Sequence, residues 1–149
     1  MDEDQNGLVK LELFDIADMT APYSLGTTVL GENENPQWNY SEARYNRHAF
    51  TYQIVNENPD RFTAPVTLAT NSETGEYEEK DRLYLFEING KQDRTLGSID
   101  EIGHISVIRD QWQNSQHRTV IHEDTVFYIN NTSVWSTQWL DPSEQMEPI

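Results

Sequence analysis

The stretch that decides the fold is LELFDIADMTAP, at residues 11–22. Its first half alternates apolar and charged residues, so that Leu11 and Leu13 fall on one side of an extended chain and Lys10 and Glu12 fall on the other. An alternation with period two is typical of a half-buried β-strand. The second half is a polar turn closed by a proline. This stretch therefore predicts a strand that runs into a turn.

Short strand-like segments recur along the rest of the chain. The clearest is LYLFEI at residues 83–88, which Asn89-Gly90 follows with a hairpin signal. Pro65 is expected at the start of its strand or on a sheet edge, where proline is tolerated. Turn residues separate the segments at about 8–12 residues, and no segment has the periodicity of a long helix, so the fold class is all-β. The predicted strands lie at residues 8–16, 27–30, 49–55, 65–70, 83–88, 94–99, 104–108, 118–122, 125–129 and 133–137.

The chain is strongly acidic and has no cysteine. Its 149 residues are enough for one ordinary domain, and 26 acidic against 10 basic residues give a formal net charge of -16. Nucleic acid is a poor partner because phosphate binding needs clustered Lys and Arg, and the same repulsion disfavours an anionic membrane surface. Without cysteine there is no disulfide and no thiolate metal site. Solubility explains the charge, with a high-salt habitat or a cation-binding surface as alternatives.

Four segments of the chain carry a resemblance to one known family. They are residues 7–18 with the turn at 21–22, residues 40–50 (YSEARYNRHAF), residues 83–99, and residues 117–134. In order and spacing they resemble a family of secreted bacterial and archaeal proteins with a C-terminal β-propeller domain. The resemblance covers most of residues 7–142. It implies antiparallel four-stranded sheets arranged as consecutive propeller blades, with a β-sandwich as the alternative.

The length of the chain limits how much of a propeller it can form. A blade has four strands in about 40–50 residues, so this chain accounts for two to three blades. We expect one all-β domain or partial propeller over residues 1–149, with blade segments at 7–35, 40–100 and 104–142 and a frayed tail at 143–149. A fragment of a larger propeller is the favoured interpretation. An arc that self-associates and a compact remnant are the alternatives, because an isolated arc exposes strand edges.

One short motif suggests a metal site at the start of the chain. Asp2, Asp4, Asn6 and Gly7 match the opening of a calcium-binding loop, in which alternating oxygen ligands wrap the cation and glycine allows the sharp turn. The bidentate acid expected at position twelve is missing, since Leu13 stands there. A solvated acidic hairpin at the chain end is the favoured interpretation, and a calcium loop is the alternative. Calcium is the only cofactor that the sequence suggests.

The best polar cluster for specific recognition surrounds residue 42. Glu42, Tyr45 and His48 lie close together in the sequence, and Trp38 and Trp112 fall in polar segments where their rings are expected to be exposed. Exposed aromatic rings can form a platform for sugar stacking. The resemblance places residues 42–48 at the entry to a blade, which favours a structural role in hydrogen bonding between blades. The four histidines have no recognised zinc spacing, and His117 and His122 are expected on opposite faces of one strand.

These features favour a non-catalytic binding or scaffolding module, with a protein or a carbohydrate as the partner. No catalytic motif occurs in the sequence; a carbohydrate-active or metal-assisted hydrolase is the first alternative, and a self-associating structural remnant is the second. The resemblance implies that the parent protein is secreted or on the cell surface. No stretch reaches 18 apolar residues, so no membrane span is predicted, and the acidic segment at residues 1–6 is unlike a signal peptide. Homo-oligomers through exposed strand edges, or contacts with the rest of a larger propeller, are the expected assemblies.

Overall fold

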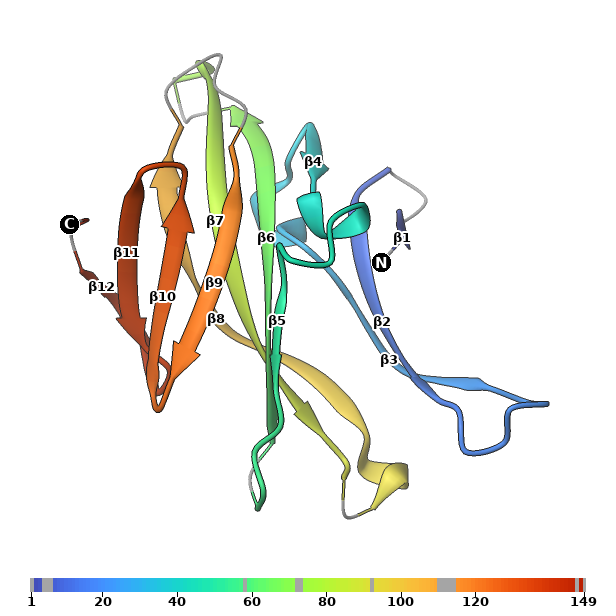
Figure 1. The fold of residues 1–149 in the computed structure, drawn as a ribbon. Helices are drawn as coiled ribbons and strands as arrows, with labels where there is room; N and C mark the ends of the chain where they lie inside the picture. Colours follow the sequence, from blue (N-terminus) through green and yellow to red (C-terminus); the bar gives the residue numbers. More distant parts are fainter. Residues whose placement is uncertain are drawn as a thin grey trace.

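The computed structural model of this chain describes residues 2–3, 7–57, 59–71, 74–91, 93–109, 115–146 and 148, with the backbone alone described at residues 2, 3 and 94. Within these residues it contains three antiparallel sheets and three short 3-10 turns (Figure 1). The first sheet has β1 (Asp2–Glu3), β2 (Val9–Asp15) and β3 (Tyr23–Val29). The second has β4 (Trp38–Tyr40), β5 (Thr51–Gln53), β6 (Asp60–Asn71), β7 (Tyr77–Asn89) and β8 (Ser98–Ile108). The third has β9 (His117–His122), β10 (Thr125–Asn130), β11 (Ser133–Gln138) and β12 (Asp141–Met146). The 3-10 turns are η1 (Glu32–Glu34), η2 (Glu42–Arg44) and η3 (Arg94–Leu96). The prediction of an all-β fold of antiparallel sheets is confirmed.

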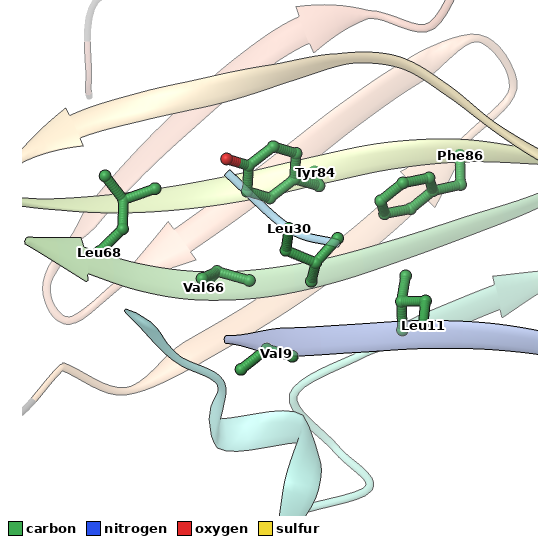
Figure 2. Close-up of a cluster of buried hydrophobic side chains, with 7 residues drawn as sticks. All are labelled: Val9, Leu11, Leu30, Val66, Leu68, Tyr84 and Phe86. Atoms are coloured by element: carbon green, nitrogen blue, oxygen red, sulfur yellow. The ribbon is translucent and has the colours of Figure 1, made fainter. Parts of the chain in front are cut away.

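The second sheet lies between the other two and is buried on both faces. Alternate residues of β7 show this, since Tyr84 and Phe86 belong to one apolar cluster and Leu83 and Leu85 belong to the other. The first cluster joins β6 and β7 to the β2–β3 hairpin, as Figure 2 shows. Its fully or almost fully buried members are Val9, Leu11, Leu30, Val66, Leu68, Tyr84 and Phe86. Burying each such side chain contributes roughly 1.5–3 kcal/mol, so apolar contact holds the first sheet to the second.

The second apolar cluster joins the second and third sheets. Its members are Leu83, Leu85, Ile105, Val126, Tyr128 and Trp139. A polar link reinforces it, because Arg61 donates hydrogen bonds to the carbonyl of Glu123 at 2.6 Å and to the carboxylate of Asp124 at 2.5 Å. The same guanidinium lies 4.9 Å from the ring centre of Trp139, within the range of a cation–π contact. Sequentially adjacent sheets therefore pack face to face, as neighbouring propeller blades do.

Pro65 does not begin its strand, so of the two positions expected from sequence it takes the one on a sheet edge. It lies inside β6, opposite Leu83 of β7. On the other side of β6, β5 pairs with residues 61–63 and β4 with residues 67–69, so Pro65 falls in the gap between them. Its missing N–H therefore faces a local sheet edge, where proline is tolerated. The hydroxyl of Ser41 donates to the Pro65 carbonyl at 2.6 Å and satisfies it.

Two expectations are wrong at the C-terminal half. The predicted strand at 94–99 begins as the 3-10 turn η3. The next strand, β8, extends from Ser98 to Ile108 and therefore crosses the boundary expected between two blade segments at 100–104. The tail is also not frayed over residues 143–146, because β12 pairs with β11 from Asp141 to Met146. The third sheet has the expected four strands, whereas the described residues of the other two form three and five. None of the described helices is both long and apolar enough to cross a membrane.

Candidate binding site

A solvent-open cavity of about 440 Å³ lies where the second and third sheets meet. It is at the end of the molecule where β4 lies and β9 begins (Figure 1). Its lining residues are Trp38, Tyr40, Glu42, Thr67, Arg109, Ser115 and His117. They come from β4, η2, β6, β9 and the residues that follow β8 or precede β9, so packing of the third sheet on the second creates the cavity.

The edge strand β4 places two aromatic rings at the cavity. Trp38 and Tyr40 are two residues apart on a strand, so they project from the same face, and both rings are partly exposed. Asn39 between them points to the opposite face and is buried. Its side-chain oxygen accepts from the N–H of Val9 at 2.6 Å, and its amide donates to the carbonyl of Leu30 at 2.6 Å. Asn39 thus fixes β4, and with it the two rings, against the first sheet.

The carboxylate of Glu42 connects the segment after β4 to β9. It accepts hydrogen bonds from the backbone N–H of His117 at 3.0 Å, from the amide of Asn46 at 2.5 Å, and from the guanidinium of Arg118 at 3.2 Å. Partial burial acts to raise the pKa of Glu42, and the three hydrogen-bond donors act to lower it. The donors have the larger combined effect, so the pKa lies below its usual value. Glu42 is therefore an ionised, hydrogen-bonded carboxylate at neutral pH.

His117 lies behind Glu42 and is only 3% exposed. Its Nδ1 lies 2.7 Å from the hydroxyl of Tyr128, and the two rings stack with an interplanar angle of 7°. Burial lowers the pKa of His117, and the nearby carboxylates of Asp81 and Glu42 offset this only in part. The ring is therefore neutral at pH 7, with one nitrogen protonated.

The hydroxyl of Tyr128 is the hydrogen-bond partner of the His117 ring. Burial raises the pKa of Tyr128 well above its usual value, so the hydroxyl is protonated. When this hydroxyl donates to Nδ1, His117 carries its proton on Nε2, and when Nδ1 donates to the hydroxyl, Nε2 is an acceptor. No described residue is bonded to Nε2, and His117 lines the cavity.

A second carboxylate beneath the cavity is also held by hydrogen bonds. Asp81 is 1% exposed and accepts from the hydroxyls of Thr67 at 2.6 Å and Ser115 at 2.5 Å, and from the amide of Asn130 at 3.0 Å. A buried carboxylate is tolerated when such donors replace its hydration. Because Thr67 and Ser115 give their protons to Asp81, only their oxygen lone pairs are available to the cavity.

The cationic group at the cavity is neutralised as well. Arg109 forms an ion pair with Glu79 at 3.1 Å, and its backbone N–H donates to the carbonyl of Glu79 at 3.2 Å. The hydroxyl of Tyr77 donates to the other carboxylate oxygen of Glu79 at 2.7 Å. The cavity therefore combines two exposed aromatic rings with charges that are already paired, and with a few hydrogen-bonding polar atoms.

The structure brings together two of the five recognition residues predicted from sequence. Trp38 and Glu42 both line the cavity, although Trp38 lies in strand β4 rather than in a loop. Tyr45 is 74% exposed and stacks on Tyr40 outside the lining, at 6.2 Å between ring centres. His48 is exposed, and its backbone N–H donates to the side-chain oxygen of Asn46 at 3.0 Å. Trp112 lies outside the described residues.

Five of the lining residues were not among those predicted. They are Tyr40, Thr67, Arg109, Ser115 and His117. Tyr40 lies between Trp38 and Glu42 in the sequence, whereas the other four are distant from them and reach the cavity through the packing of two sheets. One signal was available for His117, because the spacing to His122 placed one of the two histidines on the inner face. The structure confirms that spacing, since His117 is buried and His122 is exposed.

The calcium loop predicted at the start of the chain remains a prediction. Asp4 and Asn6 lie outside the described residues, and Asp2 is described only by its backbone, which pairs with Lys10. In the described parts of the chain, no three or more His, Cys, Asp or Glu side chains are grouped so that they could hold a metal ion. Binding of Ca²⁺ near residues 2–6, measured by isothermal titration calorimetry, would test this prediction.

Consecutive antiparallel sheets that pack face to face are consistent with neighbouring blades of a protein of the propeller class. The chain belongs to the β-propeller domain family, whose sequence model, described as a beta propeller domain, matches residues 1–141. Comparisons with curated proteins and with solved structures found no match.

Proposed function

We propose that this chain is a non-catalytic binding module and that the cavity between β4 and β9 is its recognition site. The family supports a binding or scaffolding role in general. The observation that carries the proposal is that the carboxylates at the cavity are held by hydrogen-bond donors of the chain itself. Glu42 and Asp81 each accept from three groups, so most of their acceptor capacity is used within the chain.

The pKa of Glu42 also favours binding over hydrolysis. A glycoside hydrolase needs one carboxylic acid that stays protonated near neutral pH, which requires a raised pKa. The pKa of Glu42 is lowered instead, so this residue is ionised at neutral pH. The remaining features of the cavity, two partly exposed rings and paired charges, suit recognition of a ligand that is left chemically unchanged.

A ligand screen with two readouts tests the proposal. The chain, labelled with ¹⁵N, is mixed separately with neutral sugars, amines, carboxylates and short peptides, and the amide spectra are recorded. We expect at least one class to shift the amides of Trp38, Tyr40 and Ser115, and the ¹H spectrum of that ligand to be unchanged after a day at 25 °C. Shifts confined to other residues, or chemical conversion of the ligand, would contradict the proposal.

The setting of the module is a further part of the proposal. From the resemblance to secreted propeller proteins, we propose that the parent protein acts outside the cell or on its surface. The outer face of the third sheet supports contact with another copy or with further sheets, because Val120 is 49% exposed and Met146 is 53% exposed on strands β9 and β12. Light scattering of the purified chain tests self-association, and a monomer at all concentrations would contradict it.

A further inference from the structure

We infer that the cavity between β4 and β9 recognises an uncharged sugar residue of a glycan. This inference rests on the proposed function, since it names the ligand class of the same site. It follows from three properties of the cavity, which are its paired charges, its aromatic rings and its hydrogen-bonding atoms.

The paired charges argue against both kinds of ionic ligand. A cationic ligand needs an available carboxylate, but Glu42 accepts from three donors that include Arg118, Asp81 is only 1% exposed, and Glu79 is shared by Arg109 and Tyr77. An anionic ligand needs an available cation, but Arg109 pairs with Glu79 and Arg118 pairs with Glu42. The net charge of -16 repels anions further. A neutral ligand needs neither an available carboxylate nor an available cation.

The aromatic rings provide an apolar surface of suitable size. Trp38 and Tyr40 project from one face of β4 about 6.6–6.8 Å apart along the strand, which is comparable to the width of one sugar ring. The exposed fractions of these residues are 38% and 43%, so covering them with the C–H face of a sugar removes apolar area from water. Tyr45 stacks against Tyr40 and limits its movement, which reduces the entropy lost on binding.

The hydrogen-bonding atoms at the cavity match a hydroxyl group. His117 lines the cavity, and its Nε2 is a donor or an acceptor according to which of Nδ1 and the Tyr128 hydroxyl donates in their shared hydrogen bond. Thr67 and Ser115 present acceptor oxygens, because both hydroxyl protons are given to Asp81. A sugar hydroxyl can both donate and accept, so it can bond to these oxygens and to Nε2 in either form. A volume of about 440 Å³ is also within the usual range of about 300–1,000 Å³ for small-ligand sites.

Neutral and charged sugars of the same ring size separate this inference from its rivals. The probes are methyl β-D-glucoside, methyl α-D-mannoside, N-acetylglucosamine, and the trisaccharides cellotriose, mannotriose and laminaritriose, compared with glucosamine and glucuronate. Binding is followed by amide shifts of the ¹⁵N-labelled chain. We expect at least one neutral probe to bind with a Kd on the order of millimolar or tighter and to shift the amides of Trp38, Tyr40 and Ser115.

Two surface variants test the aromatic platform. Trp38→Ala and Tyr40→Ala should each weaken binding of the best neutral probe about five- to tenfold, as expected for the loss of one stacking ring. Phe14→Ala removes a similarly exposed ring on β2, outside the cavity, and should leave the Kd unchanged. Neither cavity ring belongs to the two apolar clusters, so both variants should fold, as their thermal unfolding will show.

The outcomes separate the two proposals. If glucosamine, glucuronate or a peptide shifts the cavity amides and no neutral sugar does, the inference about sugars is wrong and the proposed binding function stands. If neutral sugars shift only residues elsewhere, or bind Trp38→Ala and Tyr40→Ala as tightly as the parent chain, the inference is likewise wrong. If no ligand class shifts the cavity amides, both proposals fail.

Discussion

The carboxylate of Glu42 accepts the backbone N–H of His117 at 3.0 Å, a contact between residues 75 positions apart in the chain. Glu42 belongs to the segment that follows β4, and His117 is the first residue of β9. One side chain thus holds the edge of the second sheet against the start of the third. It also positions the cavity wall, because both residues line the cavity.

Replacing this carboxylate should weaken the junction between the two sheets. Glu42→Gln keeps the shape of the side chain but removes the charge that Asn46, Arg118 and the His117 N–H share. We expect the free energy of unfolding to fall by about 1–2 kcal/mol, since hydrogen bonds to charged groups are stronger than neutral ones. Urea unfolding gives this value. Glu57→Gln, at an exposed glutamate, is the matched control and should change stability by less than about 0.5 kcal/mol. Equal effects of the two substitutions would show that the junction does not depend on Glu42.

The contribution of Glu42 should disappear in acid. Because its pKa in the folded chain is lowered from 4.5, its stabilisation is complete above that value and is lost as the pH falls through the folded-state pKa. The difference in unfolding free energy between the parent chain and Glu42→Gln should therefore be constant from pH 6 to 5 and should shrink below pH 4.5. A difference that stays constant down to pH 3 would contradict this assignment.

His117 should give a separate pH dependence at higher pH. Burial lowers its pKa from 6.5, so the unfolded chain takes up a proton at this residue before the folded chain does. The unfolding free energy should therefore decrease as the pH falls below 6.5, until the folded-state pKa is reached. Titration of the imidazole signals by NMR should place the pKa of His117 below 6.5. The variant His117→Gln should have a smaller slope of stability against pH in this range, and an unchanged slope would refute the prediction.

The strands could be predicted from sequence where burial leaves a local pattern. Residues 9–13 alternate because one face of β2 is buried, and residues 83–88 are almost continuously apolar because β7 is buried on both faces. The strand that contains Pro65 begins at Asp60 rather than at residue 65, because proline is also accommodated at the gap between β4 and β5, which follows from the sheet pairing. The tail misled the prediction, because residues 141–146 are too polar to resemble a strand.

The site was only partly predictable for a related reason. Trp38 and Glu42 stand out locally, as an aromatic ring and a carboxylate within a polar segment. The part played by His117, Ser115 and Asp81 depends on which atoms face one another across two sheets, and no local pattern encodes that. The hydrogen bonds that Asp81 accepts join residues 14 to 49 positions apart.

Asn39 should be among the most sensitive polar residues of the chain. Its amide satisfies the N–H of Val9 and the carbonyl of Leu30, both buried at the contact with the first sheet. Asn39→Ala leaves both backbone groups without a partner, and each orphaned group costs about 1–3 kcal/mol, so we expect a loss of roughly 2–5 kcal/mol in urea unfolding. Hydrogen exchange of the Val9 amide should accelerate by more than the global change in stability. Protection of Val9 that is unchanged relative to other β2 amides would contradict this role.

The strand β12 gives the last prediction, because it is held to the second sheet by a side chain that imitates backbone pairing. Gln145 accepts from the N–H of Ser106 at 2.8 Å with Oε1 and donates to the carbonyl of Ser106 at 3.0 Å with Nε2. Ser106 lies on the edge strand β8, so the amide of Gln145 covers two edge groups that would otherwise face solvent. Gln145→Ala should lower the unfolding free energy by about 1–2 kcal/mol and should expose the Ser106 amide to exchange.

A neighbouring residue on the same strand provides the control for Gln145. The hydroxyl of Ser143 bonds only to Asp141, two residues away and exposed. Ser143→Ala should therefore change stability by less than about 0.5 kcal/mol and leave the exchange of the Ser106 amide unaltered. Gly103 offers a further check, because a Cβ at this position would clash with the ring of Pro142. Gly103→Ala should therefore displace β12 and expose the Ser106 amide even with Gln145 intact. If Gly103→Ala and Gln145→Ala both leave that amide protected, β12 does not dock on β8 in solution.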